Sequence, residues 1–241
     1  MRGLEAVGAG RYRDRLRFRP WRGDADVAHL TAVPGAPGPA PETVRRCCRT
    51  LAERGFITAV TDPLDVVERQ GFLDAGFTVR EELHVLVHDL ATIPDPPAVM
   101  TRRGARRDRR AALAVDALAF SAFWRLDELG FATALTSTPA ARFRVATPTR
   151  VVAYAISGRA GRRGYLQRLA VDPALSGRGV GRALVIDALR WMRRHGTERA
   201  MVNTQLANER ALRLYRGVGF RLHPARLAVL TSRLDDRQRA R

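Results

Sequence analysis

The chain has 241 residues, of which 46% are hydrophobic and 27% charged, a balance typical of a globular protein with one or two domains and a sizeable core. Its 42 Lys and Arg residues against 24 Asp and Glu give a formal net charge of +18, and every one of those 42 is an arginine. A basic surface attracts polyanions, but so general an arginine excess indicates a compositional bias, and no nucleic-acid reading motif accompanies it. Nucleic acid is therefore not the expected partner.

Several other classes of protein are not expected either. No apolar run approaches the ~20 residues of a membrane-spanning helix, and the N-terminus has no apolar stretch suited to a signal peptide. Cys47 and Cys48 are adjacent, a spacing that fits neither a zinc site nor a disulfide and indicates reduced structural thiols. No histidine pairs with a second ligand type at metal spacing. We expect a cytoplasmic protein without a metal or a membrane partner.

The first 90 residues predict alternating strands and helices. A basic tail occupies residues 1–14, and apolar and charged residues alternate over 16–21, which predicts a strand. The elements expected next are a short helix over 24–31 with Asp24 as its N-cap, a proline- and glycine-rich linker over 34–41, a helix over 42–54, a strand over 56–60, a helix over 63–75 and a strand or hairpin over 77–90.

Proline-rich residues 91–100 predict an inter-domain linker, and the arginine-rich run 101–110 a solvated helix face or flexible hinge rather than a patch for nucleic acid or an acidic partner. Helices follow over 111–123 and 126–136, where Phe123, Trp124 and Phe131 either line a pocket or, as we favour, belong to the core. Three antiparallel strands are then expected over 142–146, 151–157 and 164–171, with a turn over 158–161.

The stretch 165–194 organises the rest of the chain. An apolar strand ends at Asp172-Pro173, a loop with Gly177, Gly179 and Gly181 follows, and an amphipathic helix begins at the last of these glycines. The first N–H groups of a helix have no intrahelical partner and lie at the positive end of its dipole. Glycines let a phosphate approach them, so this turn either binds an anion or is simply tight.

Two signatures here resemble those of the GCN5-related N-acetyltransferases (GNAT). Arg178-x-x-Gly181-x-Ala183 matches the Q/R-x-x-G-x-G/A motif, and Asn208 to Phe220 is similar to the second family motif. The resemblance covers the last ~135 residues, about one domain. It implies an α/β (α+β) GNAT fold, with a central mixed, largely antiparallel twisted sheet flanked by helices.

Residues 70–77 resemble 214–220, since Phe72 falls where Tyr215 does and Gly-Phe closes both. The elements over 42–75 also repeat the order expected for a helix over 181–195, a strand over 199–204 and a helix over 208–217. We interpret the N-terminal half as a degenerate partial GNAT copy that binds no CoA; a chance match is the alternative. The expected divisions are a tail at 1–14, the half domain at 15–90, a linker at 91–106, the catalytic domain at 107–234 and a tail at 235–241.

The resemblance further implies transfer of an acetyl group from acetyl-CoA to an amine. The strand backbone would pair with the pantetheine arm, the helix start would hold the pyrophosphate, and the N–H of Leu169 or Val171 would face the developing oxyanion. The implied cofactor-binding residues are Leu169, Ala170, Val171, Gly177, Arg178, Gly179, Val180, Gly181, Arg182, Ala183 and Asn208.

Tyr215 matches the family's general acid, which protonates the departing thiolate. The similar ribosomal-protein and protein N-terminal alanine acetyltransferases carry a glutamate base where this chain has Asn203, which cannot accept a proton at neutral pH. The base is therefore a water chain, another acid, or none if the amine arrives neutral, and Asn203 would orient the water or the amine. The alternative is a catalytically idle acyl-CoA-binding module. Either form is expected as a monomer or homodimer.

Overall fold

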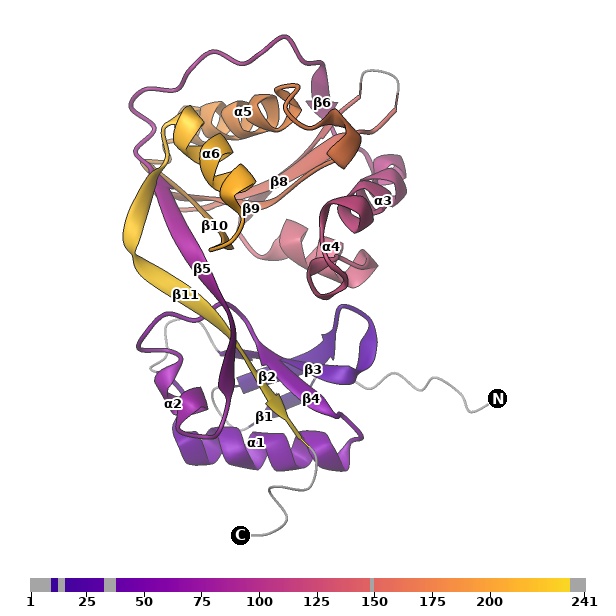
Figure 1. Cartoon of the computed structure of the whole chain (residues 1–241), viewed down its shortest axis with the longest axis vertical. Coiled ribbons are helices and arrows are strands. Elements are labelled where there is room, and N and C mark those ends of the chain that lie inside the picture. Colours follow the sequence, from indigo (N-terminus) through magenta and orange to yellow (C-terminus); the bar gives the residue numbers. More distant parts are fainter. Residues whose placement is uncertain (1–9, 13–15, 33–37, 148–149, 235–241) are drawn as a thin grey trace. The chain divides into compact units, whose positions relative to one another are not determined.

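The computed structural model describes residues 10–12, 16–32, 38–147 and 150–234 (Figure 1). Most of the predicted tail at 1–14, half of the predicted linker at 34–41 and the tail at 235–241 lie outside these ranges. The chain divides into two compact units, one of residues 1–84 with 224–241 and one of residues 85–223. The predicted boundaries differ from this division, because they assigned residues 224–234 to the C-terminal domain.

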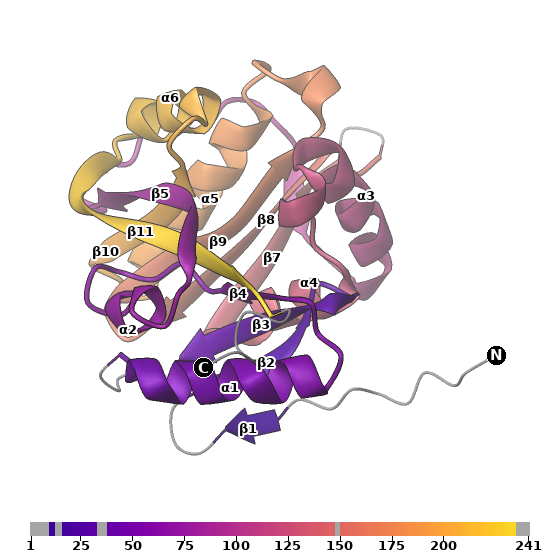
Figure 2. The same cartoon turned by 60° about the horizontal axis from the view of Figure 1, so that its bottom comes forward.

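The first unit combines a sheet with a long and a short helix. Its strands have the order β1-β2-β3-β4-β11, and only β3 and β4 run parallel. Figure 2 shows α1 beside α2. The elements are β1 (Gly10–Tyr12), β2 (Leu16–Trp21), β3 (Asp24–Ala32), α1 (Pro41–Glu53), β4 (Thr58–Thr61), α2 (Gln70–Leu73), the start of β5 (Thr78–His88) and the end of β11 (Arg221–Arg233).

The helix predicted over residues 24–31 is wrong, because this segment is strand β3. Asp24 pairs with Trp21 across a two-residue turn whose residues, Arg22 and Gly23, both have positive φ. β3 pairs with β2 on one side and with β4 on the other. Pairing on both edges therefore overrides a weak local helix pattern.

The predicted helix over residues 42–54 is confirmed as α1. Its buried face carries Val44, Cys47, Cys48 and Leu51, and burial raises the pKa of the two thiols to about 11 and about 12. The helix predicted over residues 63–75 is reduced to the single turn α2. Before it, the Asp65 carboxylate accepts hydrogen bonds from the N–H groups of Val67 and Glu68, both at 2.8 Å, which favours a turn over a continuous helix.

The second unit has a mixed, largely antiparallel sheet with helices on both faces, as predicted. Its strand order is β10-β9-β8-β7-β6, and only β9 and β10 run parallel. The elements are the end of β5, β6 (Thr101–Arg103), α3 (Arg109–Ala119), α4 (Glu128–Thr136), β7 (Ala140–Ala146), β8 (Ala153–Ala160), β9 (Arg163–Val171), α5 (Val180–Arg194), β10 (Arg199–Gln205), α6 (Glu209–Val218) and the start of β11.

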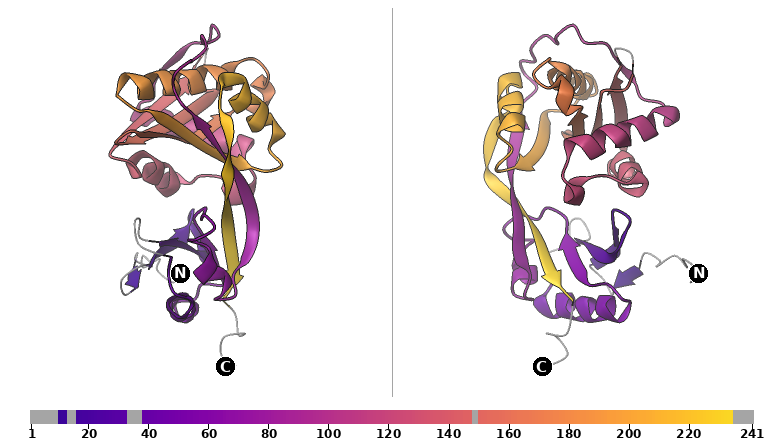
Figure 3. Two further views of the ribbon diagram at one scale, coloured as in Figure 1. Left: turned by 90° about the vertical axis from the view of Figure 1, so that its left-hand side faces the viewer. Right: turned by 45° about the vertical axis from the view of Figure 1, so that its right-hand side comes forward.

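The two faces of this sheet have separate cores. Figure 3 shows α5 and α6 on one face and α3 and α4 on the other. Along β8, Ala153 and Ala155 pack in the α5 core while Tyr154 and Ile156 pack in the α3–α4 core, the alternation that a sheet buried on both faces requires. Phe131 belongs to the second core, as favoured from the sequence.

Residues 101–110, predicted as a solvated helix face or a flexible hinge, form a short strand, a turn and the start of α3. Residues 101–103 form β6, which pairs with β7, and Arg102 binds Asp108 through two hydrogen bonds of 2.6 and 2.8 Å. The Arg102 hydrogen bond lowers the pKa of Asp108 to about 2. Upstream, Ile93 and Val99 pack against the α5 core and Arg190 donates to Asp95 at 2.7 Å. The segment predicted as a linker is thus held along α5.

The two units share a repeated order of elements, which supports the internal repeat. α1, β4, α2 and β5 correspond to α5, β10, α6 and β11. Gly219 is the C-cap of α6 and Gly76 lies in the turn that follows α2, and both have positive φ. The N–H of the following phenylalanine bonds to the carbonyl of Phe72 in one copy and Tyr215 in the other, each at 3.0 Å.

Candidate functional site

The sheet of the second unit opens between two parallel strands. β9 and β10 pair only where residues 163–165 face residues 199–201, although β9 continues to Val171 and β10 to Gln205. Beyond Tyr165 and Met201, no register between these two strands is found in the described part of the chain. The second half of β9 therefore presents an unpaired backbone edge.

The backbone of Leu169 and Val171 points to this open edge. The N–H of Asp172 donates to the carbonyl of Val152 at 2.8 Å, on the β8 side. Because alternate residues of a strand direct their N–H groups to the same side, Ala170 also faces β8. Leu169 and Val171 then face away from it, so two of the three predicted strand residues offer free hydrogen-bonding groups and Ala170 does not.

The predicted glycine turn leads directly into α5. Gly177 and Gly179 both have φ of 76°, a left-handed conformation that favours glycine. Gly179 is the N-cap of α5, and no side chain caps this helix. The first intrahelical bond runs from the N–H of Ala183 to the carbonyl of Gly179. The N–H groups of Val180, Gly181 and Arg182 thus remain at the positive end of the helix dipole.

The two arginines of this turn differ in their surroundings. Arg178 is exposed, whereas Arg182 donates to the carbonyl of Gly217 at 2.6 Å and ties α5 to α6. A Cβ on Gly181 would lie 3.3 Å from Leu214 and 3.4 Å from Val171. Gly181 therefore allows the start of α5, the end of β9 and α6 to come together, and Arg178 is the arginine left to contact an anion.

The predicted linker also reaches this turn. A Cβ on Gly179 would lie 3.2 Å from Cγ of Pro97, so Pro97 packs against one side of the N-cap. Asp172 fixes the other end of the loop, since its carboxylate accepts from the N–H of Ala174 at 3.0 Å and from Arg150 at 2.9 Å.

α6 carries the candidate general acid. Its N-cap is Asn208, whose Oδ1 accepts from the N–H of Ala211 at 3.1 Å, so the Nδ2 of this amide is the group left for a ligand. Tyr215 is 5% exposed and its ring contacts Phe220. Burial raises the pKa of the Tyr215 phenol, and the positive charge of Arg168 partly opposes that shift.

Asn203 lies on β10 between buried Val202 and Thr204, and its own side chain is exposed. It therefore belongs to the solvent-facing side of the strand, where a carboxamide contacts water or a ligand.

A buried charge network, not predicted from the sequence, lies beside β9. Asp116 is fully buried on α3 and receives two 2.7 Å hydrogen bonds from Arg168 and one of 2.6 Å from the Tyr154 hydroxyl. Arg168 also donates to the carbonyl of Trp124 at 2.6 Å and stacks 3.5 Å above the Phe120 ring. Arg168 is the residue before Leu169, so the network fixes the start of the open edge.

The sequence did contain a signal for this pair. Asp116 interrupts an apolar helix and Arg168 an apolar strand. An opposite charge in each of two apolar elements that pack together indicates a buried ion pair.

Comparison with known proteins shows which family this part of the chain is similar to. The sequence profile of the acetyltransferase (GNAT) family matches residues 110–220. N-alpha-acetyltransferase 30 of Saccharomyces cerevisiae is 40% identical over 58 residues, which are 24% of this chain and 33% of that protein. Mycothiol acetyltransferase of Segniliparus rotundus is 38% identical over 67 residues, which are 28% of this chain and 25% of that protein. The matches thus span a third or less of these relatives.

Solved structures resemble the fold over almost the whole chain. A tandem GNAT protein from the clavulanic acid biosynthesis pathway has a TM-score of 0.64 at 14% identity. The match covers 92% of this chain and 79% of the chain of that protein. A GCN5-related N-acetyltransferase from Kribbella flavida has a TM-score of 0.62 at 16% identity, and the match covers 94% of this chain and 90% of that one. At these identities the likeness concerns the fold alone. In the described ranges, every helix is too short or too polar to cross a membrane.

Proposed function

We propose that this chain transfers an acetyl group from acetyl-CoA to a primary amine, since residues 110–220 match the model of the acetyltransferase (GNAT) family. The observation that carries the proposal is the unpaired edge of β9, which ends beside the uncapped start of α5. Acetyl-CoA has an extended chain with amides, which suits the strand edge, joined to a diphosphate, which suits the start of the helix.

The strand edge and the helix start would hold different parts of the cofactor. The free backbone groups of Leu169 and Val171 would pair with the pantetheine amides, as a peptide pairs with a sheet edge. The N–H groups of Val180, Gly181 and Arg182 would bind the pyrophosphate, with Arg178 adding charge. Hydrogen bonds to a charged acceptor contribute about 1.5–3 kcal/mol each, so the helix start would supply much of the affinity.

The transfer would proceed in one ternary complex. The amine nitrogen attacks the thioester carbonyl carbon, whose oxygen becomes negative and accepts a hydrogen bond from the N–H of Leu169 or Val171. The C–S bond then breaks, and the Tyr215 phenol gives its proton to the CoA sulfur. The acylated nitrogen loses one proton to water, and a proton from water restores the phenol. Since burial raises the pKa of this phenol, Tyr215 is protonated at neutral pH and ready to act as the acid.

The amine would reach the site neutral or lose its proton to water. Asn203 replaces a base in the similar N-terminal alanine acetyltransferases, and its exposed carboxamide would hold the attacking amine or a water through hydrogen bonds. The rate should then rise with pH as the neutral fraction of the amine grows. It should show no alkaline fall below about pH 10, the ordinary pKa of a phenol.

Asn203 also favours a second function, because an asparagine cannot act as a base. In that case the chain would be a catalytically idle module that binds acyl-CoA. Release of free CoA thiol distinguishes the two. The test is thiol release from acetyl-CoA with a panel that contains a peptide with a free N-terminal amine and small primary amines. We expect turnover with at least one of them. CoA binding without turnover on any amine would favour the idle module.

Tyr215→Phe should lower kcat about 10²–10⁴-fold, the usual contribution of a positioned general acid, and leave the Kd for acetyl-CoA within about twofold. Tyr165→Phe is the matched control, because Tyr165 lies on β9 where that strand still pairs with β10. Equal activity of the two variants would exclude Tyr215 as the acid.

A further inference from the structure

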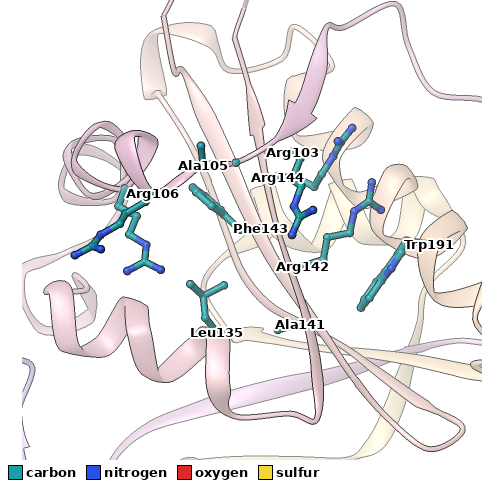
Figure 4. A pocket seen from close by; sticks show the side chains of 11 residues that line it. Arg103, Ala105, Arg106, Leu135, Ala141, Arg142, Phe143, Arg144 and Trp191 are labelled. Atoms are coloured by element: carbon teal, nitrogen blue, oxygen red, sulfur yellow. The ribbon is translucent and has the colours of Figure 1, made fainter.

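A cavity lined mainly by arginines lies at the far edge of the second unit's sheet. Its volume is about 560 Å³, and its wall includes Arg103, Arg106, Arg109, Arg142, Arg144 and Trp191. Figure 4 shows Arg142, Arg144 and Trp191 on one side of β7 and Arg106 and Leu135 on the other. The cavity therefore lies around the first part of strand β7.

The fold brings these charges together through two elements. β6 is three residues long and pairs with β7 only from Arg144 to Ala146, so the start of β7 lies at the edge of the sheet. Arg142 and Arg144 are alternate residues and project from the same face of β7. Arg103 is the last residue of β6, Arg106 lies in the segment that follows, and Arg109 is the first residue of α3.

Of the five guanidinium groups that line this cavity, two share the carboxylate of Asp187. Asp187 forms ion pairs with Arg142 at 3.2 Å and with Arg144 at 3.0 Å. Within the described ranges, no acidic side chain forms an ion pair with Arg103, Arg106 or Arg109. Burial and the nearby Arg144 lower the pKa of Arg142, against the opposing effect of Asp187. A second anion would relieve this repulsion between like charges.

This cavity is distinct from the site proposed for the acetyl-CoA pyrophosphate. Trp191 follows Val180 by eleven residues in α5, which places it about 16 Å further along the helix axis at 1.5 Å per residue. None of the residues predicted to hold the cofactor lines the cavity.

We propose that this cavity binds a small, multiply charged phosphate, either free pyrophosphate or the diphosphate of an organic ester. Guanidinium groups bind phosphate through paired N–H donors, and five of them line this cavity. The Trp191 side chain in the cavity wall offers apolar surface on which the organic part of an ester would pack.

The test is calorimetric titration of the full chain with pyrophosphate and with a nucleoside diphosphate, each with acetyl-CoA at saturation. We expect saturable binding of pyrophosphate at one site. Arg106→Ala and Arg109→Ala should each weaken it about tenfold or more, the loss expected for one charge-assisted bond. The matched controls Arg107→Ala and Arg110→Ala remove the same charge from neighbouring residues outside the cavity, and they should change the affinity less than twofold.

The two ligands identify the source of the phosphate. Tighter binding of the nucleoside diphosphate, lost in Trp191→Ala, indicates an organic ester, and equal binding indicates the free anion. Either result supports the site. Equal losses in Arg106→Ala and Arg107→Ala would mean unspecific attraction to a basic surface and would overturn the proposal. So would absence of saturable binding, or complete displacement of pyrophosphate by acetyl-CoA.

Discussion

At the scale of single residues, the turn before α5 depends on two left-handed glycines. A Cβ on Gly177 would meet nothing within 4 Å, whereas a Cβ on Gly179 would lie 3.2 Å from Pro97. Gly177→Ala should therefore cost about 1–2 kcal/mol of unfolding free energy through backbone strain alone. Gly179→Ala should cost more, because Pro97 must also move. Urea denaturation of both variants measures the difference, and an equal loss would contradict the packing of Pro97 against this turn.

His88 makes the stability of the folded state depend on pH. Its Nδ1 accepts from the N–H of Leu90 at 2.9 Å, so the proton is on Nε2, which lies 3.2 Å from the carbonyl of Val218. Burial lowers the pKa of His88 below 6.5. The unfolded chain then binds the proton more tightly, so the stability is present above pH 6.5 and is lost as the pH falls through the folded pKa.

We therefore expect the melting temperature to fall between pH 7.5 and 5.5 by a larger amount in the native chain than in His88→Gln, whose amide can both accept and donate but does not titrate. His84→Gln, on the same strand, is the control and should keep the native pH dependence. The same pH dependence in the native chain and in His88→Gln would remove His88 as its source.

These residues also show what the sequence could predict. Gly177 and Gly179 have the left-handed conformation of a glycine turn, and Asn208 is the N-cap of α6, features that a few neighbouring residues determine. The roles of these residues and of Tyr215 toward acetyl-CoA stay predictions. The partner of Arg182 could not be predicted in this way, because Gly217 is 35 residues distant in the chain and reaches it only through the packing of α6 on α5.

At the scale of elements, the ion pair of Asp116 and Arg168 joins α3 to β9. Asp116→Asn would leave Arg168, whose side chain is 10% exposed, without its counter-charge. Breaking such a buried pair costs about 3–5 kcal/mol. The double variant Asp116→Leu, Arg168→Met should be less destabilised than Asp116→Asn, because no buried charge remains.

Chemical denaturation of the single and double variants tests this. Glu209→Gln is the control, since it breaks an exposed ion pair of 3.1 Å with Arg213 and should leave the midpoint unchanged. A double variant less stable than Asp116→Asn would show that the pair itself, and not the isolated charge, dominates.

Element type was predictable wherever a periodic pattern and the local hydrogen bonds agreed, as in α1, α5 and the strands β7 to β10. It failed over residues 24–31, where pairing with β2 and β4 decides the conformation. The helix predicted over residues 63–75 was too long, because the Asp65 side chain forms a turn with nearby backbone groups. Both failures come from interactions that hydrophobic periodicity does not encode.

At the scale of the whole molecule, the two repeats exchange their last strands. β5 begins in the first unit and ends in the second, and β11 begins in the second and ends in the first. The apolar pattern of residues 227–231 does not indicate to which unit this strand belongs, because the same side chains would suit either sheet. The predicted boundary at residue 90 assumed that each repeat is one continuous stretch of chain. The assignment of residues 224–234 to the C-terminal domain rested on the same assumption.

This exchange predicts that the C-terminal segment maintains the N-terminal fold. Ala228, Leu230 and Leu234 lie in the same core as Cys47 and Leu51 of α1, and Thr231 pairs with Val60 of β4. Removing residues 224–241 would expose that core and leave β4 with one unpaired edge. Hydrogen exchange should then show loss of protection in α1 and β4, while protection in α5 is largely kept. A shorter deletion of residues 235–241 is the control. Unchanged exchange of α1 in the longer deletion would show that the first unit folds without the strand it receives.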